Sequence, residues 1–285
     1  MYQTPYGRLD FSRPLVMGIL NITPDSFYSK SRVGDEKLLV ERVGEMLAAG
    51  ADMIDVGGAS TRPGSSEPTE KEELNRIVPS IKILRKNFPN LLIAVDTYRA
   101  NVAHAAYEEG VDIINDISGG AFDQDMISLI SRINIPYIVM HLRGTRETMH
   151  QVHSYNDVVR DVFMYFEEKI NLLNALGIHQ IILDPGFGFS KQLEDNYKLL
   201  GAISTYKEKL NYPILVGISR KRMIQQVVGT DADHALNGTT AAHVIALMNG
   251  ASILRVHDVK EAKEAIKITQ YFLNVNKISD ILHQN

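Results

Sequence analysis

Eight short apolar runs, each followed by polar residues, recur along this chain with amphipathic segments between them. The first run, LVMGILNI at residues 15–22, leads into Thr23, Pro24, Asp25 and Ser26. These turn formers are compatible with a strand that simply leaves the core and equally with a functional loop. A single occurrence of the pattern does not distinguish the two. The other runs lie at residues 53–58, 92–97, 113–117, 137–141, 181–185, 214–219 and 252–257.

The segments between the runs have the apolar spacing of helices, at residues 38–49, 70–86, 100–109, 156–176, 193–209 and 239–249. Nearly continuous apolar strands that alternate with such helices are typical of a parallel sheet covered by helices. Eight units predict an α/β fold, the (β/α)8 TIM barrel, for which ~250 residues is usual. A doubly wound open sheet is the alternative, but it commonly has about six strands, and no GxGxxG follows the first run.

The 285 residues contain no linker or low-complexity tract, so we predict a single domain over residues 1–285. The segment YGRLDFSRP, which precedes the first strand, is predicted to form a short hairpin that closes the N-terminal end of the barrel. A chain without cysteine has no disulfide, no thiolate metal site and no cysteine nucleophile, and it fits a reducing compartment.

Charge and hydropathy limit the classes of partner. The formal net charge of −4 gives no reason to expect nucleic acid or an anionic membrane. No apolar run approaches the ~20 residues that a membrane span needs, and the N-terminus lacks the apolar stretch of a signal peptide. We therefore expect a cytoplasmic protein.

Polar side chains stand at the end of every predicted strand, which is where reacting groups lie in this fold. One such residue is usually a helix cap or a turn former, whereas eight successive ends that converge on one barrel mouth indicate a site. The residues are Asn21, Asp55, Asp96, Asn115 with Asp116, His141, Asp184, Ser219 with Arg220 and Lys221, and Arg255 with His257 and Asp258.

Two kinds of chemistry occur among these residues. Asp96, Asn115 and Asp184 offer acceptors and one amide, which suit a flat heterocycle with N–H and amino donors. Asn21 could present an amide oxygen to a hard cation such as Mg2+. A heterocycle, an anion and Mg2+ together indicate a transferase with an anionic leaving group. The cationic donors suited to phosphate or carboxylate are Arg62, Arg220, Lys221, Arg255 and His257.

Eight motifs, in register over essentially the whole chain, resemble the dihydropteroate synthase family. They are MGILNITPDSF, DVGGASTRPGS, DTYRANVA, INDISGG, MHLRGT, LDPGFGFSK, GISRKRMI and RVHDV. The resemblance implies a (β/α)8 barrel, a homodimer and a role in bacterial folate biosynthesis. It implies joining of 6-hydroxymethyl-7,8-dihydropterin pyrophosphate to p-aminobenzoate, with release of pyrophosphate, at a site where sulfonamides compete with p-aminobenzoate.

The resemblance also implies a role for each matching residue. The catalytic residues would be Asp96, Asp184, Lys221 and Arg255, in a dissociative reaction that needs no protein nucleophile. The pterin site would contain Asp96, Asn115, Met140, Asp184, Gly217 and Lys221. The pyrophosphate site would contain Asn21, Arg62, Arg255 and His257, with Mg2+ at Asn21. The p-aminobenzoate site would contain Thr61, Arg62, Pro63, Phe189, Ser219 and Lys221.

The first loop departs from the family pattern. Where the family usually continues DSFSDGG, this chain has DSFYSKSR at residues 25–32. Ser29 takes the place of the loop aspartate, so no loop carboxylate is assigned. We expect Lys30 or Arg32 to bring positive charge over the pyrophosphate instead.

Two other functions remain open. A methyltetrahydrofolate methyltransferase that acts with a corrinoid protein would share Asp96, Asn115 and Asp184, but it would not need the cationic set. A pterin-binding protein without catalysis, or one half of a folate-pathway fusion, is disfavoured by the intact cationic set and by the chain length. His141, His150 and His153 fit no standard zinc spacing.

Overall fold

Parallel strands form the centre of the computed structural model, which describes residues 1–22, 32–58, 68–145, 147–149, 151 and 154–282, with backbone alone at 32–35 and 277–282. The barrel strands are β3 (Leu15–Asn21), β4 (Met53–Gly57), β5 (Leu92–Asp96), β6 (Ile113–Asp116), β7 (Tyr137–Met140), β8 (Ile181–Asp184), β9 (Leu215–Val216) and β10 (Ile253–Val256). They pair in the order β8-β7-β6-β5-β4-β3-β10-β9. An isolated parallel bridge between Leu183 and Ile214 links the two ends of this order, so the predicted (β/α)8 barrel is confirmed.

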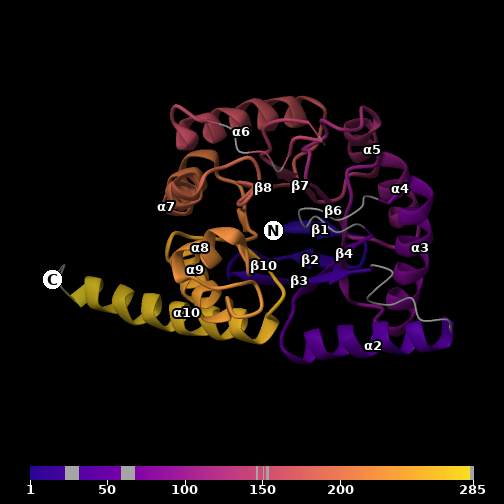
Figure 1. Ribbon diagram of the computed structural model, residues 1–285, viewed down its shortest axis with the longest axis horizontal. Helices are drawn as coiled ribbons and strands as arrows, with labels where there is room; N and C mark the ends of the chain where they lie inside the picture. Colours follow the sequence, from indigo (N-terminus) through magenta and orange to yellow (C-terminus); the bar gives the residue numbers. More distant parts are fainter. Residues whose placement is uncertain (23–31, 59–67, 146, 150, 152–153, 283–285) are drawn as a thin grey trace.

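Helices form a ring around the strands (Figure 1). They are α2 (Arg32–Ala48), α3 (Glu70–Asn87), α4 (Ala100–Glu108), α5 (Asp125–Ile133), α6 (Val158–Ala175), α7 (Leu193–Leu210), α8 (Arg222–Val228), α9 (Leu236–Met248) and α10 (Val259–Leu282). Local sequence sets several of their ends: Thr69 and Glu72 form a capping box before α3, and α7 ends at Asn211 in the left-handed conformation. The part of the chain that the structure describes has no helix of the length and apolarity that a membrane span requires.

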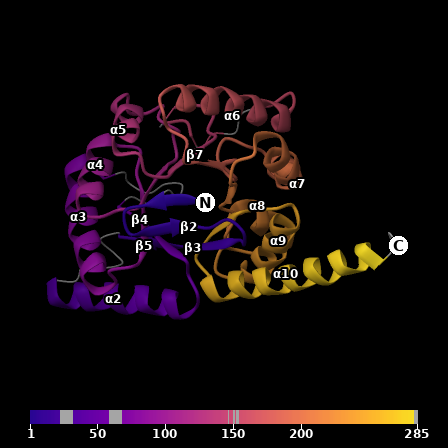
Figure 2. The same ribbon diagram turned by 180° about the vertical axis from the view of Figure 1, so that it is seen from behind.

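A small antiparallel hairpin closes one end of the barrel. Strand β1 (Tyr2–Thr4) pairs with β2 (Gly7–Leu9), and Figure 2 shows them within the ring of helices. Leu9 is fully buried among apolar residues at the starts of the barrel strands, including Leu15 and Met53. The predicted hairpin at the N-terminal end of the barrel is therefore confirmed, although it begins earlier, at Tyr2.

The last helix extends beyond the barrel (Figure 1). Its middle part exposes four large apolar side chains at the spacing of one helical face: Ile268, Tyr271, Phe272 and Val275, which are 70%, 75%, 53% and 49% exposed. An apolar stripe of this kind on the surface of a water-facing helix indicates a contact surface.

Candidate active site

Strand register brings the predicted polar residues together at the C-terminal mouth of the barrel. Asp96 on β5 lies opposite Asn115 on β6, and Met140 on β7 lies opposite Asp184 on β8. Because neighbouring parallel strands end together here, side chains that are far apart in sequence become neighbours. The apolar runs that precede them fill the barrel and fix these ends in place.

Arg255 links two carboxylates across this mouth. Its Nε donates to Asp55 Oδ2 at 2.6 Å, and its Nη2 donates to Asp96 Oδ2 at 2.6 Å. Asn115 Nδ2 donates to the same Asp55 oxygen at 3.0 Å. Asp55 is fully buried, and its Oδ2 atom accepts hydrogen bonds from both Arg255 and Asn115. It therefore orients both side chains. The sequence marks Asp55 as a polar strand end but gives no sign of this linking position.

Burial shifts the titration of the groups around this mouth. It raises the pKa of Asp96 to about 7, and Arg255 acts in the opposite direction. It also raises the pKa of Asp184, with Lys221 opposing, and lowers the pKa of Lys221 to about 8, with Asp184 opposing. Acids and bases shifted toward neutrality in a cleft are typical of functional sites.

The loop after β8 brings an aromatic ring beside Lys221. The Nζ atom of Lys221 donates to the carbonyl oxygen of Phe187 and lies 4.6 Å from the centre of the Phe189 ring. Asp184 Oδ1 accepts from the backbone N–H of Gly186 at 2.8 Å, which fixes that carboxylate at the start of the loop. Phe189 in turn packs with Met140 and Ile117.

The residues after β9 and β10 interlock. Ser219 Oγ accepts from the backbone N–H of His257 at 3.2 Å and lies 3.2 Å from His257 Nδ1. The Arg220 guanidinium donates to both carboxylate oxygens of Asp258 at 2.8 Å and to the carbonyl oxygens of Ala232 and Asp233 at 2.9 Å. These donors of Arg220 are thus bound within the protein, while the residue also forms part of the wall of the adjacent cavity, so its contact with an anionic ligand stays a prediction.

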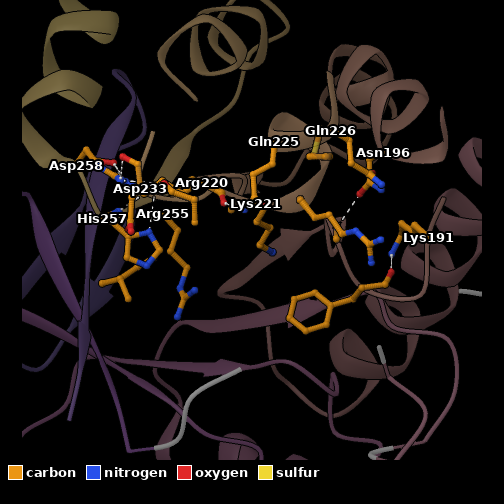
Figure 3. Close-up of a pocket in the computed structure, with 18 of the residues that line it drawn as sticks. Lys191, Asn196, Arg220, Lys221, Gln225, Gln226, Asp233, Arg255, His257 and Asp258 are labelled. Carbon is orange, nitrogen blue, oxygen red and sulfur yellow. Dashed lines mark hydrogen bonds and ion pairs between the residues drawn. The ribbon is translucent and has the colours of Figure 1, made fainter. Parts of the chain in front are cut away.

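A cavity of about 740 Å³ opens beside these groups (Figure 3). Its wall includes seven of the residues expected to bind ligands: Asn21, Phe189, Gly217, Ser219, Lys221, Arg255 and His257. Among the described residues, Asp96, Asn115, Met140 and Asp184 are not part of that wall. Asp96 is bound to Arg255, which is part of the wall, and Asn115 reaches the same arginine through Asp55.

Several expected residues fall outside the described part of the chain. Thr61, Arg62 and Pro63 lie there, as do the first-loop residues from Thr23 to Ser31, including Lys30. Of Arg32, the structure describes only the backbone, at the start of α2. His150 and His153 also fall outside the described part of the chain. His141 is described, and its burial lowers its pKa to about 2. His141 is therefore a neutral ring.

Asn21 is suited to Mg2+ only as a partial ligand. The described residues hold no group of three or more His, Cys, Asp or Glu side chains that could bind a metal ion. Mg2+, however, commonly takes one or two protein oxygens and completes its shell with water and substrate phosphates. One amide oxygen at Asn21, in the same cavity wall as Arg255 and His257, fits a metal ion that arrives with a phosphate-bearing substrate.

Two residues of the cavity wall have contacts that the sequence does not reveal. Lys191 is buried and donates to three backbone carbonyls, an arrangement that no residue pattern reveals. Arg42 lies on α2 yet forms part of the cavity wall. A cation in the middle of an amphipathic helix is ordinarily a solvated surface residue, so nothing in its sequence surroundings marks Arg42.

Comparison with known proteins agrees with this geometry. A family model described as pterin binding enzyme matches residues 17–257. The dihydropteroate synthase of Escherichia coli K12 is 40% identical over 274 residues, which cover 94% of this chain and 95% of that protein.

Two solved structures have the same fold. A Yersinia pestis dihydropteroate synthase in a sulfonamide drug complex is 39% identical, with a TM-score of 0.87, and the match covers 96% of this chain and 100% of that one. A Xanthomonas albilineans dihydropteroate synthase in complex with 7,8-dihydropteroate is 32% identical, with a TM-score of 0.82, over 93% and 95% of the two chains.

Proposed function

Because this chain belongs to the dihydropteroate synthases, a family of pterin-binding enzymes, we propose that its barrel mouth joins 6-hydroxymethyl-7,8-dihydropterin pyrophosphate to p-aminobenzoate. The products are 7,8-dihydropteroate and pyrophosphate, in folate biosynthesis. One observation carries the proposal: a single cavity wall combines the anion-binding side chains Arg255 and His257 with Lys221 and Phe189, and Arg255 reaches from that wall to Asp96.

The heterocycle would bind at the carboxylates and the amide. Asp96 and Asp184 are hydrogen-bond acceptors for ring N–H and amino groups, and Asn115 is both donor and acceptor. Their burial excludes competing water, which strengthens each hydrogen bond. Met140 and Gly217 would form walls of this pocket.

The leaving group would bind at Asn21, Arg255 and His257, with Arg62 as a further donor. In the proposed dissociative course, the C–O bond to pyrophosphate breaks first and its electron pair leaves with the pyrophosphate. Arg255 stabilises that departing charge, while the Asp96 and Asp184 carboxylates stabilise the cationic dihydropterin. A bound Mg2+ would add charge neutralisation at the phosphate oxygens.

The second substrate would bind at Phe189, Ser219 and Lys221, completed by Thr61, Arg62 and Pro63. The aromatic ring packs on Phe189, and the p-aminobenzoate carboxylate lies near cationic and hydroxyl donors. The amine attacks the cationic methylene carbon, a C–N bond forms, and the amine proton passes to water or to a nearby base. A sulfonamide would occupy this same subsite.

Release of pyrophosphate should depend on both substrates at once. We expect steady release only when the pterin pyrophosphate and p-aminobenzoate are present together, with loss of activity in EDTA and recovery on adding Mg2+. A coupled assay for pyrophosphate measures this directly. Release without p-aminobenzoate, or none with both substrates and Mg2+, would contradict the proposed function. Transfer of a methyl group from methyltetrahydrofolate would favour the alternative enzyme.

We further propose a homodimer that buries the apolar stripe of α10. The stripe formed by Ile268, Tyr271, Phe272 and Val275 lies on a helix that packs against α9, where Ile245 and Met248 are each 46% exposed. Isologous contact between two such faces would remove this apolar area from water.

Charge on that stripe should separate the subunits. We expect Ile268→Glu combined with Tyr271→Glu to sediment as a monomer where the wild type sediments as a dimer, because each interface would bury unpaired carboxylates. Leu172→Glu on α6 is a matched control, since Leu172 is 49% exposed on a different face. A monomeric wild type, or a dimeric double variant, would refute this interface.

That residues 1–285 form a single domain and that the protein acts in the cytoplasm remain predictions. The absence of cysteine is consistent with a reducing compartment. The expectation that Lys30 or Arg32 covers the pyrophosphate also remains a prediction, to be measured by the kinetics of their alanine variants.

A further inference from the structure

The loop between β8 and α7 has an unusual backbone. Gly186, Gly188 and Ser190 all have positive φ angles, of 69°, 79° and 50°. The left-handed region is open to glycine but unfavourable for serine. Ser190 therefore adopts this conformation against its local preference, so contacts with the surrounding structure must hold it.

Lys191 fixes this loop from within. Its side chain is only 6% exposed, and Nζ donates to the carbonyl oxygens of Gly186 at 2.9 Å, Phe189 at 3.2 Å and His141 at 3.4 Å. Three carbonyl acceptors match the three N–H donors of an ammonium group. The His141 carbonyl belongs to the end of β7, so Lys191 also ties the loop to the neighbouring strand.

The space around this ammonium is closed. A Cβ atom on Gly186 would collide with the carbonyl oxygen of His141 and would lie 3.2 Å from Lys191 Nζ. Burial lowers the pKa of Lys191 to about 7, opposed by Asp184 and reinforced by Lys221, with smaller effects from Asp195 and Arg143. A buried charge is costly compared with an apolar side chain of similar volume. The presence of Lys191 at this position therefore indicates that the loop requires the three hydrogen bonds of its ammonium group.

The loop that Lys191 holds contacts two residues of the proposed site, Asp184 and Lys221, and contains a third, Phe189. The Gly186 N–H donates to Asp184, the Phe187 carbonyl accepts from Lys221, and the Phe189 ring lies beneath the Lys221 ammonium. Asn196 accepts from the Gly188 N–H at 2.7 Å and secures the outer side of the same loop. Figure 3 shows Lys191 and Asn196 at the cavity, where both form part of its wall.

We propose that Lys191 is a positioning residue for the second substrate: its ammonium holds residues 186–190 so that Phe189 and Lys221 form the p-aminobenzoate subsite. Lys191 acts through this loop and takes no part in bond breaking or bond formation. The inference deepens the proposed function and rests on it. The loop also contacts the pterin side of the site through Asp184 and Lys221. Asp96 and Asn115 on that side are held independently by Arg255 and Asp55, so we expect the p-aminobenzoate side to lose more.

The test is Lys191→Met, which keeps an unbranched stem and removes all three donors. Loss of hydrogen bonds from a charged group predicts a rise of ~10-fold or more in KM for p-aminobenzoate, with a clearly smaller rise in KM for the pterin pyrophosphate. Lys191→Arg, which keeps the charge, should recover part of the loss. Hydrogen exchange should be faster at the amides of residues 186–190 in Lys191→Met.

Lys169→Met is the matched control, because Lys169 also binds a loop carbonyl, Gly119 O at 2.8 Å, on another side of the barrel. Its KM values should stay at the wild-type level. If Lys191→Met does not fold, Lys191→Gln serves in its place. Equal rises in both KM values, or an unchanged KM for p-aminobenzoate, would overturn the inference. An inactive wild type would instead overturn the proposed function.

Discussion

Replacing Lys221 with alanine is expected to lower kcat/KM for pyrophosphate release by at least ~100-fold, the scale of losing one charge-stabilising donor. Lys221 is the residue that precedes α8, and its ammonium lies between the Phe187 carbonyl and the Phe189 ring. Asp184 raises the pKa of Lys221 against the effect of burial, so the two groups are electrostatically linked. The variant loses the cation that the two proposed substrate sites share.

The controls for Lys221 separate charge from folding. Lys198→Ala on α7 removes an exposed lysine and should leave the rate unchanged. Lys221→Arg keeps the charge with a planar head group, and it should recover only part of the activity because the two cations are not interchangeable in a confined site. A rate near that of wild type in a folded Lys221→Ala protein would refute the assigned position of this lysine.

Replacing Arg255 with alanine is also expected to lower turnover by at least ~100-fold. A second effect should accompany it, because the variant leaves the carboxylates of Asp55 and Asp96 without their cation. Breaking a buried pair by removing one partner costs about 3–5 kcal/mol, so the free energy of unfolding should fall by that amount. Denaturant titration measures it alongside the kinetics.

The two effects of Arg255 can be told apart. Adding Asp55→Asn to Arg255→Ala removes one of the uncompensated charges, so stability should rise while activity stays low. Arg13→Ala breaks a more exposed pair with Asp52, whose arginine is 50% exposed, and should change stability by less than about 1 kcal/mol. A fully active Arg255→Ala enzyme would contradict the proposed stabilisation of the leaving group.

Much of the barrel is predictable from the apolar runs, because a buried parallel strand must be apolar on both faces. The run at 214–219 is an exception, since β9 contains only Leu215 and Val216. Its later residues leave the sheet, and Ser219 binds His257 instead of a strand partner. Helix α8 was not predicted, because seven residues give too little periodicity to stand out. Helix α5 was not predicted either, although it is as long as the predicted α4.

The charged residues of the site can be recognised in the sequence, whereas the groups to which they form hydrogen bonds cannot. Arg220 is recognisable as a cation at a strand end, but its partner Asp258 lies 38 residues away and its other acceptors are backbone carbonyls. Lys191 is hidden for the same reason, because every residue has a carbonyl and no residue type marks the three that Lys191 binds. Spacing therefore identifies candidate groups but not their pairing.

The barrel closes at a seam that has few backbone links. Strands β3 and β4 share a register of five residue pairs, whereas β8 and β9 are joined by the isolated bridge from Leu183 to Ile214. The segment after β8 contains Phe189, and the segment after β9 contains Ser219 and Lys221, so the proposed p-aminobenzoate subsite straddles this seam. Local separation of β8 from β9 would break few hydrogen bonds and would change the width of the p-aminobenzoate subsite. The pocket beside Asp96 and Asn115, on continuously paired strands, would keep its dimensions. A pterin pocket of fixed dimensions beside a p-aminobenzoate subsite of variable width would bind one heterocycle and accept arylamines of different size.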